Sequence, residues 1–321
     1  MLGLLLGPPS SAREVPVDAL RNILVLMEPG SEAQPAFDAA LVLARRAGAR
    51  LELLMSDYQD LHTAYFSPPT ATLQEFHETV MAAHQAVLER YSARAAAEGV
   101  PTICEALWGT PFHEMVLARV AATRPDLVVK HSVHHNRIER TLFTGSDWHL
   151  IRDCPAPLLL VKDPPRFEAP RILVCVDPLH AHDKPAALDH QLLRTAKTLA
   201  EQLGGEVHAL HVFSIPTPVT VVGDAYIAAA AVPPAAATVE SAAAAFRRLM
   251  ADHALPAERA HIRVGSPARE ILSTAKDLDA GIVVMGAVSR GRLDRWFVGN
   301  TAEAVLDRLP SSVWVEKLPQ G

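Results

Sequence analysis

Short, unbroken apolar runs alternate with longer segments of helical periodicity along most of the chain. Residues 171–176 and 281–285 are rich in Val, Ile and Leu, as buried parallel strands are when helices cover both faces of their sheet. Between 186 and 203 the apolar residues recur at helical spacing, and Gly204-Gly205 follows at once, which predicts a helix that ends there. The alternation predicts βαβ units that build a parallel sheet.

The order of these elements occurs twice. The segment Arg21–Glu28 resembles Arg171–Asp177, and Trp108–Glu114 resembles Val264–Glu270. The two copies are offset by 149 residues at Glu28 and by 155 residues near their ends, so they differ by small insertions. At roughly 160 residues, each copy is long enough to bury a core of its own. We therefore predict an α/β fold of two tandem, doubly wound domains, each with a five-stranded parallel sheet.

The pattern sets approximate bounds for these elements. In the first copy they are 22–27, 35–47, 50–55, 72–98, 101–105, 111–123, 126–130, 145–152 and 157–161. In the second copy they are 171–176, 186–203, 206–212, 236–253, 260–264, 267–278, 281–285, 300–308 and 312–316. Ser266 is expected to cap the helix at 267–278, with Pro267 in its first turn.

These elements divide the chain into two domains with a leader. Residues 1–20 are expected to be a disordered leader, 21–163 the first domain and 171–318 the second. The linker Lys162–Pro170 is short and contains several prolines. Proline stiffens such a segment, so we expect the linker to hold the halves against each other.

Composition narrows the class of partner. The chain is 49% hydrophobic and 21% charged, with a net charge of −6 and a pI near 6.2, which disfavours binding to nucleic acid. Its 3 cysteines show no C-x-x-C spacing, a usage that fits a reducing cytoplasm. No run reaches the roughly 20 apolar residues that a membrane span needs. We expect a cytoplasmic protein with no membrane partner.

The segment Met285–Glu303 carries the strongest chemical signal. It contains Gly286, Gly291 and Gly299 and several arginines, follows a predicted strand and precedes a predicted helix. Glycines let the backbone approach an anion closely, and a helix N-terminus offers free N–H groups to a phosphate. The pattern alone indicates an anion-compatible loop or a solvated basic loop.

This loop, the twofold repeat and the Asp after the first strand resemble the universal stress protein family, whose loop pattern is G-x2-G-x9-G-[S/T]. The segments Thr144–Pro157 and Val298–Glu303 resemble its tandem, E-type members more closely. The resemblance implies a Rossmann-like fold, similar to adenine-nucleotide alpha hydrolases, and ATP with its Mg²⁺ as ligand. Carried onto this chain, the implied nucleotide-binding residues of the second domain are Asp177, Val212, Gly286, Ser289, Arg290, Gly291, Gly299, Asn300 and Thr301.

Two positions depart from the family pattern. Ser289 stands where the second glycine is usual, and Asn300 stands where Ser or Thr is usual. The first copy departs further, because its counterparts of Asp177, Gly286, Ser289 and Gly299 are Glu28, His131, His134 and Thr144. We predict that the first half does not bind a nucleotide in this mode.

Single-domain members of the family pair through their last strands. By resemblance, the segments Leu158–Val161 and Val313–Lys317 are expected to pair within this chain as an internal pseudo-dimer. Such pairing would also cover Val313-Trp314-Val315, an apolar edge that otherwise favours aggregation. Further association into a homodimer and an unknown protein partner both stay open.

Residues 219–238 are apolar without a clear period. One interpretation is a low-complexity loop with a helical tail. The other is a flap over a pocket near the strand ends, and this would suit an apolar or acyl-containing ligand.

The 15 histidines include the close groups His134-His135 and His180-x-His182. Neither group has a third ligand in its sequence neighbourhood, so we expect no metal site besides a nucleotide-associated Mg²⁺. No G-x-S-x-G, H-E-x-x-H or Walker A motif is present. We expect no catalytic residues and at most weak ATPase activity.

These observations favour a non-catalytic protein of the stress response that senses a small ligand or regulates a partner, with ATP binding in the second domain. The binder of an apolar ligand and the slow ATPase are the alternatives.

Overall fold

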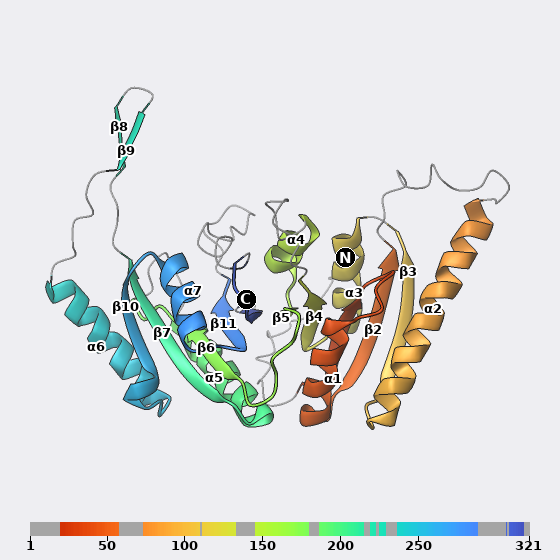
Figure 1. Cartoon of the computed structure of the whole chain (residues 1–321), viewed down its shortest axis with the longest axis horizontal. Coiled ribbons are helices and arrows are strands. Elements are labelled where there is room, and N and C mark those ends of the chain that lie inside the picture. The colour runs from red at the N-terminus through yellow and green to blue at the C-terminus, as the bar shows by residue number, and fades with distance from the viewer. Residues whose placement is uncertain are drawn as a thin grey trace, which may run out of the picture.

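The computed structural model describes residues 20–57, 73–109, 111–132, 145–179, 186–214, 219–222, 225–228, 236–287, 306 and 308–317. Within these residues a single sheet of ten strands runs through both halves, and helices cover its two faces (Figure 1). The predicted α/β fold with two five-stranded parallel units is confirmed.

The element bounds agree closely with the periodicity. The first half contains β1 Asn22–Met27, α1 Pro35–Ala47, β2 Arg50–Asp57, α2 Leu73–Ala97, β3 Thr102–Trp108, α3 Phe112–Thr123, β4 Leu127–His131, α4 Gly145–Asp153 and β5 Leu158–Val161. The second contains β6 Arg171–Cys175, α5 Ala186–Leu203, β7 Glu206–Ser214, β8 Val219–Val222, β9 Ala225–Ala228, α6 Ala236–Asp252, β10 Ala260–Gly265, α7 Pro267–Asp277, β11 Ile282–Gly286 and β12 Ser312–Glu316. A 3-10 turn at Ala257–Arg259 precedes β10. The predicted helix at 300–308 lies almost wholly outside the described residues.

The strand order is β10-β7-β6-β11-β12-β5-β4-β1-β2-β3. The five strands of the first half thus repeat the order of the five strands of the second half in reverse. Neighbouring strands inside each unit are parallel, whereas β12 and β5 are antiparallel, with Val313 opposite Leu160 and Val315 opposite Leu158. The last strands of the two copies therefore pair, as expected for an internal pseudo-dimer.

Helix ends follow the residues that predict them. Gly48 ends α1 with φ 67°, and Gly204 follows α5 with φ 68°, a left-handed conformation that glycine adopts without steric cost. Ser266 is the N-cap of α7 and Pro267 lies in its first turn, although the Ser266 side chain makes no capping hydrogen bond.

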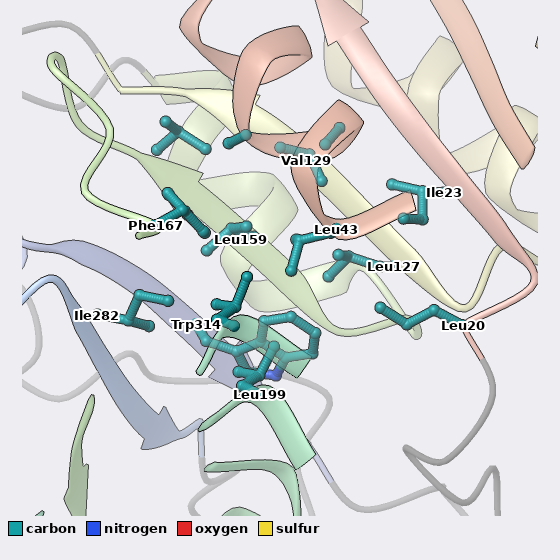
Figure 2. Close-up of a cluster of buried hydrophobic side chains, with 14 of the residues drawn as sticks. Leu20, Ile23, Leu43, Leu127, Val129, Leu159, Phe167, Leu199, Ile282 and Trp314 are labelled. Carbon is teal, nitrogen blue, oxygen red and sulfur yellow. The ribbon is translucent and has the colours of Figure 1, made fainter. Parts of the chain in front are cut away.

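The hydrophobic core does not stop at the boundary between the halves. On one face of the sheet, α1, α2, α5 and α6 pack over a cluster that joins Leu43 and Leu159 of the first half to Leu199 and Trp314 of the second (Figure 2). Trp314 is only 1% exposed. Helices α3, α4 and α7 cover the other face over a second cluster that also contains residues of both halves. Burial of apolar side chains therefore stabilises the halves against each other.

The linker lies close against the second half. A Cβ on Gly205 would stand 2.2 Å from the carbonyl oxygen of Pro170, and one on Gly281 would stand 2.5 Å from that of Arg166. Only glycine allows so close an approach at these positions. Phe167 of the linker is buried in the core, so the linker is a packed element, consistent with its expected stiffness.

The segment 219–238 contains an element that the sequence pattern did not predict. Strands β8 and β9 form an antiparallel hairpin, with Val219 opposite Ala228 and Val222 opposite Ala225. Figure 1 shows this hairpin standing away from the ten-stranded sheet. Neither predicted form of the segment includes a hairpin, although Val219-Thr220-Val221-Val222 is β-branched throughout and the dipeptide Gly223-Asp224 is typical of a two-residue hairpin connection. The expected helical tail corresponds to α6.

No described helix is both long enough and apolar enough to cross a bilayer.

Candidate functional site

The sheet brings three of the predicted site residues to one edge. In the second half β6 lies between β7 and β11, with Cys175 opposite Leu210 and Val174 opposite Val284. Two residues further along, Asp177, Val212 and Gly286 follow at the carboxyl ends of these strands. The chain leaves β6 toward one side of the sheet for β7 and reaches β11 on the other, which makes this edge a switch point where α/β proteins place ligands.

Asp177 is held by helix α5. Its backbone N–H donates to Oδ1 of Asp189, 3.1 Å away, and the Asp189 side chain is buried. The fixed main chain leaves the half-buried Asp177 side chain at the edge of the sheet. A carboxylate in this place can accept hydrogen bonds from a ligand hydroxyl or amine.

A histidine lies beneath this edge. His211 of β7 is 2% exposed, and its Nδ1 lies 3.2 Å from the carbonyl oxygen of Val176. A carbonyl oxygen only accepts, so Nδ1 carries the hydrogen. The imidazole also stacks on Phe246 of α6, with ring centroids 5.9 Å apart. His211 thus fixes the backbone of the residue that precedes Asp177.

Gly286 has a packing role in the structure. A Cβ at this position would stand 2.7 Å from Cδ2 of Leu188 and 3.5 Å from Cδ1 of Leu192. The first distance is shorter than real Cβ contacts, so the glycine is needed for α5 to approach the end of β11. Packing of α5 thus accounts for this glycine, which the resemblance assigns to the nucleotide loop.

Glu316 is a buried carboxyl group next to the start of that loop. Its side chain accepts hydrogen bonds from Nε2 of Gln191 at 2.5 Å and from Oγ1 of Thr195 at 2.6 Å. Its main-chain oxygen accepts from the N–H of Ala287, the residue after Gly286, at 2.9 Å. Burial raises the pKa of Glu316, while the Thr195 and Gln191 hydrogen bonds oppose the shift.

The sequence motifs did not indicate Asp189, His211 and Glu316, because none of them belongs to a recognised pattern. A polar residue within an otherwise apolar segment is the sequence feature that could have indicated them. Asp189 directly follows Leu188, and His211 directly follows Leu210 in a strand. The rest of the predicted site lies outside the described residues: Ser289, Arg290, Gly291, Gly299, Asn300 and Thr301.

The first half has a contact between a histidine and a carboxylate at the equivalent place. Glu28 and His131, the counterparts of Asp177 and Gly286, lie with Oε2 and Nδ1 3.0 Å apart. The N–H of Glu28 donates to Oε1 of Gln34 at 2.9 Å, and Nε2 of Gln34 donates to the oxygen of Glu28 at 2.8 Å. The imidazole of His131 therefore lies at the position that Gly286 occupies in the second half.

More charged groups gather at the same end of β4. Nζ of Lys130 lies 2.8 Å from Oδ1 of the buried Asp147 of α4. Nζ of Lys162 donates to Oγ of Ser132 at 3.1 Å. These contacts tie β4, α4 and the start of the linker together, which gives the charged side chains of this region a structural role.

A cleft of about 820 Å³ lies elsewhere, between the linker and helix α1. Its wall includes Arg166, Arg171, Glu206 and Asp279. These charges neutralise one another, since Arg171 lies 3.2 Å from Glu206 and Arg166 pairs with Asp279. The cleft lies at the amino ends of β6 and β7, away from the edge that holds Asp177.

Among the described residues, no group of three or more His, Cys, Asp or Glu side chains has the arrangement of a metal site. The four clustered histidines His134, His135, His180 and His182 lie outside the described part of the chain.

Comparisons with known proteins agree with this architecture. The model of the universal stress protein family matches the chain twice, over residues 19–162 and 169–317. Universal stress protein E of Salmonella typhi is 31% identical over 300 residues, covering 92% of this chain and 94% of that protein. Universal stress protein E of Escherichia coli strain K12 is 31% identical over 303 residues, covering 94% of this chain and 95% of that protein.

Solved structures show the same fold. The crystal structure of a putative universal stress protein from Pseudomonas aeruginosa UCBPP-PA14 has a TM-score of 0.74 at 25% identity and covers 94% of each chain. That of a universal stress protein from Archaeoglobus fulgidus DSM 4304 has a TM-score of 0.60 at 17% identity, covering 92% of this chain and 98% of that one. The second likeness concerns the fold alone.

Proposed function

Because this chain belongs to the universal stress protein family, we propose that it is a non-catalytic protein of the stress response whose second half binds an adenine nucleotide. Binding at this edge would report the cellular nucleotide state to a regulated partner. ATP, with the Mg²⁺ that accompanies it, is the proposed ligand.

The observation that carries the proposal is the convergence of Asp177, Val212 and Gly286 at the switch point of the second sheet unit. Asp177 offers a carboxylate and Val212 an apolar surface, and at Gly286 the main chain enters the loop that the family resemblance assigns to the phosphates. These are the features that a ribose hydroxyl, a planar base and a nearby phosphate require.

The first half supports the proposal by contrast. Its glycine counterpart is His131, which is paired with Glu28 at 3.0 Å. Nucleotide entry there would need the imidazole to leave its carboxylate partner and the phosphate to approach that same carboxylate. The proposal therefore assigns one nucleotide to each chain.

The test is titration of the purified full-length protein with ATP and Mg²⁺ by calorimetry, supported by native mass spectrometry. We expect one equivalent to bind. Asp177→Ala should weaken binding at least tenfold, because the ligand loses a carboxylate acceptor, which corresponds to about 1.4 kcal/mol.

Glu28→Ala is the matched control, since Glu28 is the counterpart of Asp177 in the first half. It should leave ATP binding unchanged. Equal losses in the two variants, or no saturable binding in the unmodified protein, would contradict the proposal.

The same samples address the alternatives. A co-purifying lipid detected by mass spectrometry, together with silence toward ATP, would favour the apolar ligand. Steady release of phosphate that Asp177→Ala abolishes would favour the slow ATPase.

A further inference from the structure

The two halves carry different side chains at one equivalent place, between the second and third strands of each sheet unit and the helix that follows. In the first half, Arg119 of α3 bridges two carboxylates on neighbouring strands, Glu52 of β2 and Glu105 of β3. Glu52 is 1% exposed, and a buried carboxylate needs a partner of opposite charge. The fold thus holds a cation between two strand side chains under this helix.

In the second half, all three residues have changed. The strand registers make His208 the counterpart of Glu52 and His261 the counterpart of Glu105. The helix position of Arg119 is taken by Ala275, at the same offset of 156 residues that relates Glu105 to His261. Two imidazoles remain, and the guanidinium that lay between the strand side chains is gone, while Arg171 and Arg259 of this region pair with Glu206.

The two imidazoles face each other. Nδ1 of His208 lies within hydrogen-bond distance of Nε2 of His261, at 3.1 Å, and the two rings are nearly parallel, end to end, with centroids 5.3 Å apart. Two nitrogens bound to one tetrahedral Zn²⁺ at 2.0–2.1 Å stand about 3.3 Å apart. The observed separation is close to this value, and both rings would have to turn out of their present end-to-end contact to direct their lone pairs at one ion.

A carboxylate orients one of the rings. Nε2 of His208 lies 3.4 Å from Oε1 of Glu206. An ionised carboxylate only accepts, so the hydrogen is on Nε2, and the Nδ1 that faces His261 carries a lone pair. A histidine that donates its other ring N–H to a carboxylate is the usual arrangement at protein metal sites.

We propose that His208 and His261 form a chelating site for a divalent late first-row transition metal ion, with Zn²⁺, Cu²⁺ and Ni²⁺ as the class of ligand. Imidazole suits these ions and does not suit Mg²⁺ or Ca²⁺. Since no third ligand of the same kind completes a cluster among the described residues, water fills the remaining positions. His261 is half-buried on the edge strand β10, so water can reach it.

This site is separate from the proposed nucleotide site. His208 and His261 lie near the amino ends of β7 and β10, whereas Val212 lies toward the carboxyl end of β7. The metal proposal does not depend on ATP binding, and it adds a second kind of metal site to the nucleotide-associated Mg²⁺ expected from sequence.

The experiment is a Zn²⁺ titration of untagged, chelator-stripped full-length protein, without nucleotide, followed by calorimetry and by thermal unfolding. We expect one equivalent to bind and the Tm to rise with free Zn²⁺, since a ligand of the native state stabilises it by mass action. His261→Gln should weaken binding at least tenfold and abolish the rise in Tm. His208→Gln should do the same, and circular dichroism checks that each variant is folded.

His253→Gln is the matched control. His253 and His190 also face each other, with ring nitrogens 2.8 Å apart, but among the contacts of the described residues no carboxylate orients either ring as Glu206 orients His208. The control should bind Zn²⁺ as the unmodified protein does. Unchanged affinity in His261→Gln, or loss of the site in His253→Gln instead, would overturn the assignment. If His208→Gln does not fold, the half-buried His261 variant decides the question.

Discussion

Nζ of Lys317 lies 2.8 Å from the carbonyl oxygen of Cys154, so a residue of the second half caps helix α4 of the first. The same amine donates to the carbonyl oxygen of Arg152, also at 2.8 Å. The last carbonyls of a helix have no partner within it, and a cation near them is favoured by the helix dipole. These contacts add a polar connection between the two halves to the apolar packing that they share.

Lys317 should make stability depend on alkaline pH. Burial lowers its pKa from 10.5 to about 8. Between these values the unfolded chain binds a proton that the native protein does not, so stability rises with pH. Relative to Lys317→Met, the free energy of unfolding of the unmodified protein should increase between pH 8 and 10.5, by on the order of 3 kcal/mol. Urea unfolding of both proteins across this range measures the difference, and parallel pH profiles would contradict it.

Glu316 should act in the opposite sense at lower pH. Burial raises its pKa above 4.5, so the native protein holds a proton that the unfolded chain has lost. The stability contributed by the neutral carboxyl group is therefore present at low pH and lost as pH rises through the native pKa. The stability of Glu316→Gln should gain on that of the unmodified protein as pH rises from 4.5. A constant difference in urea unfolding between the two proteins would refute this.

Gly286→Ala should destabilise the protein whether or not a ligand binds. Its Cβ would meet Leu188 Cδ2 at 2.7 Å, and overpacking of this kind costs roughly 1–3 kcal/mol. Denaturant unfolding without nucleotide measures the loss. Leu188→Ala removes the obstructing atoms, so a double-mutant cycle should show that the two changes are strongly non-additive. Additive losses would mean that the glycine has another role.

Trp314→Ala should weaken the connection between the halves. Deletion of so large a buried side chain costs roughly 3–5 kcal/mol, and Trp314 packs in the cluster that both halves share. We expect calorimetry to show two separable transitions for this variant. Phe246→Ala is the control, because Phe246 is equally buried but belongs to α6. This helix contacts β7 and β10, which lie at the end of the strand order away from the β12–β5 pair. It should lose a similar free energy and retain the cooperativity of the unmodified protein.

Sequence periodicity predicted nearly all described elements to within a few residues, because buried parallel strands and amphipathic helices leave strong local patterns. The repeat made Leu158–Val161 and the strand around Trp314 recognisable as counterparts, and resemblance to the family supplied their pairing. The hairpin β8–β9 was missed although its residues include the strand formers Val, Thr, Tyr and Ile, because each strand has only 4 residues and an alanine-rich run follows them.

The candidate site was less predictable, for a physical reason. Side chains that meet at a sheet edge come from distant segments, as Glu28 and His131 do across 103 residues. Local spacing carries no trace of such contacts. The His208–His261 pair became recognisable only when the strand registers placed the two residues at the positions equivalent to Glu52 and Glu105 of the other copy.

The antiparallel seam between β5 and β12 has an evolutionary consequence. In a dimer of identical chains every substitution appears on both sides, so a change that helps one subunit is imposed on the other. Joining the copies through a linker fixes their ratio and gives each a partner at high effective concentration. Each copy can then change alone. Trp314 of the second copy pairs with Leu159 of the first across the β12–β5 contact, and Gly286 of the second copy corresponds to His131 of the first. Covalent tethering lets two halves of one fold carry different side chains at equivalent positions.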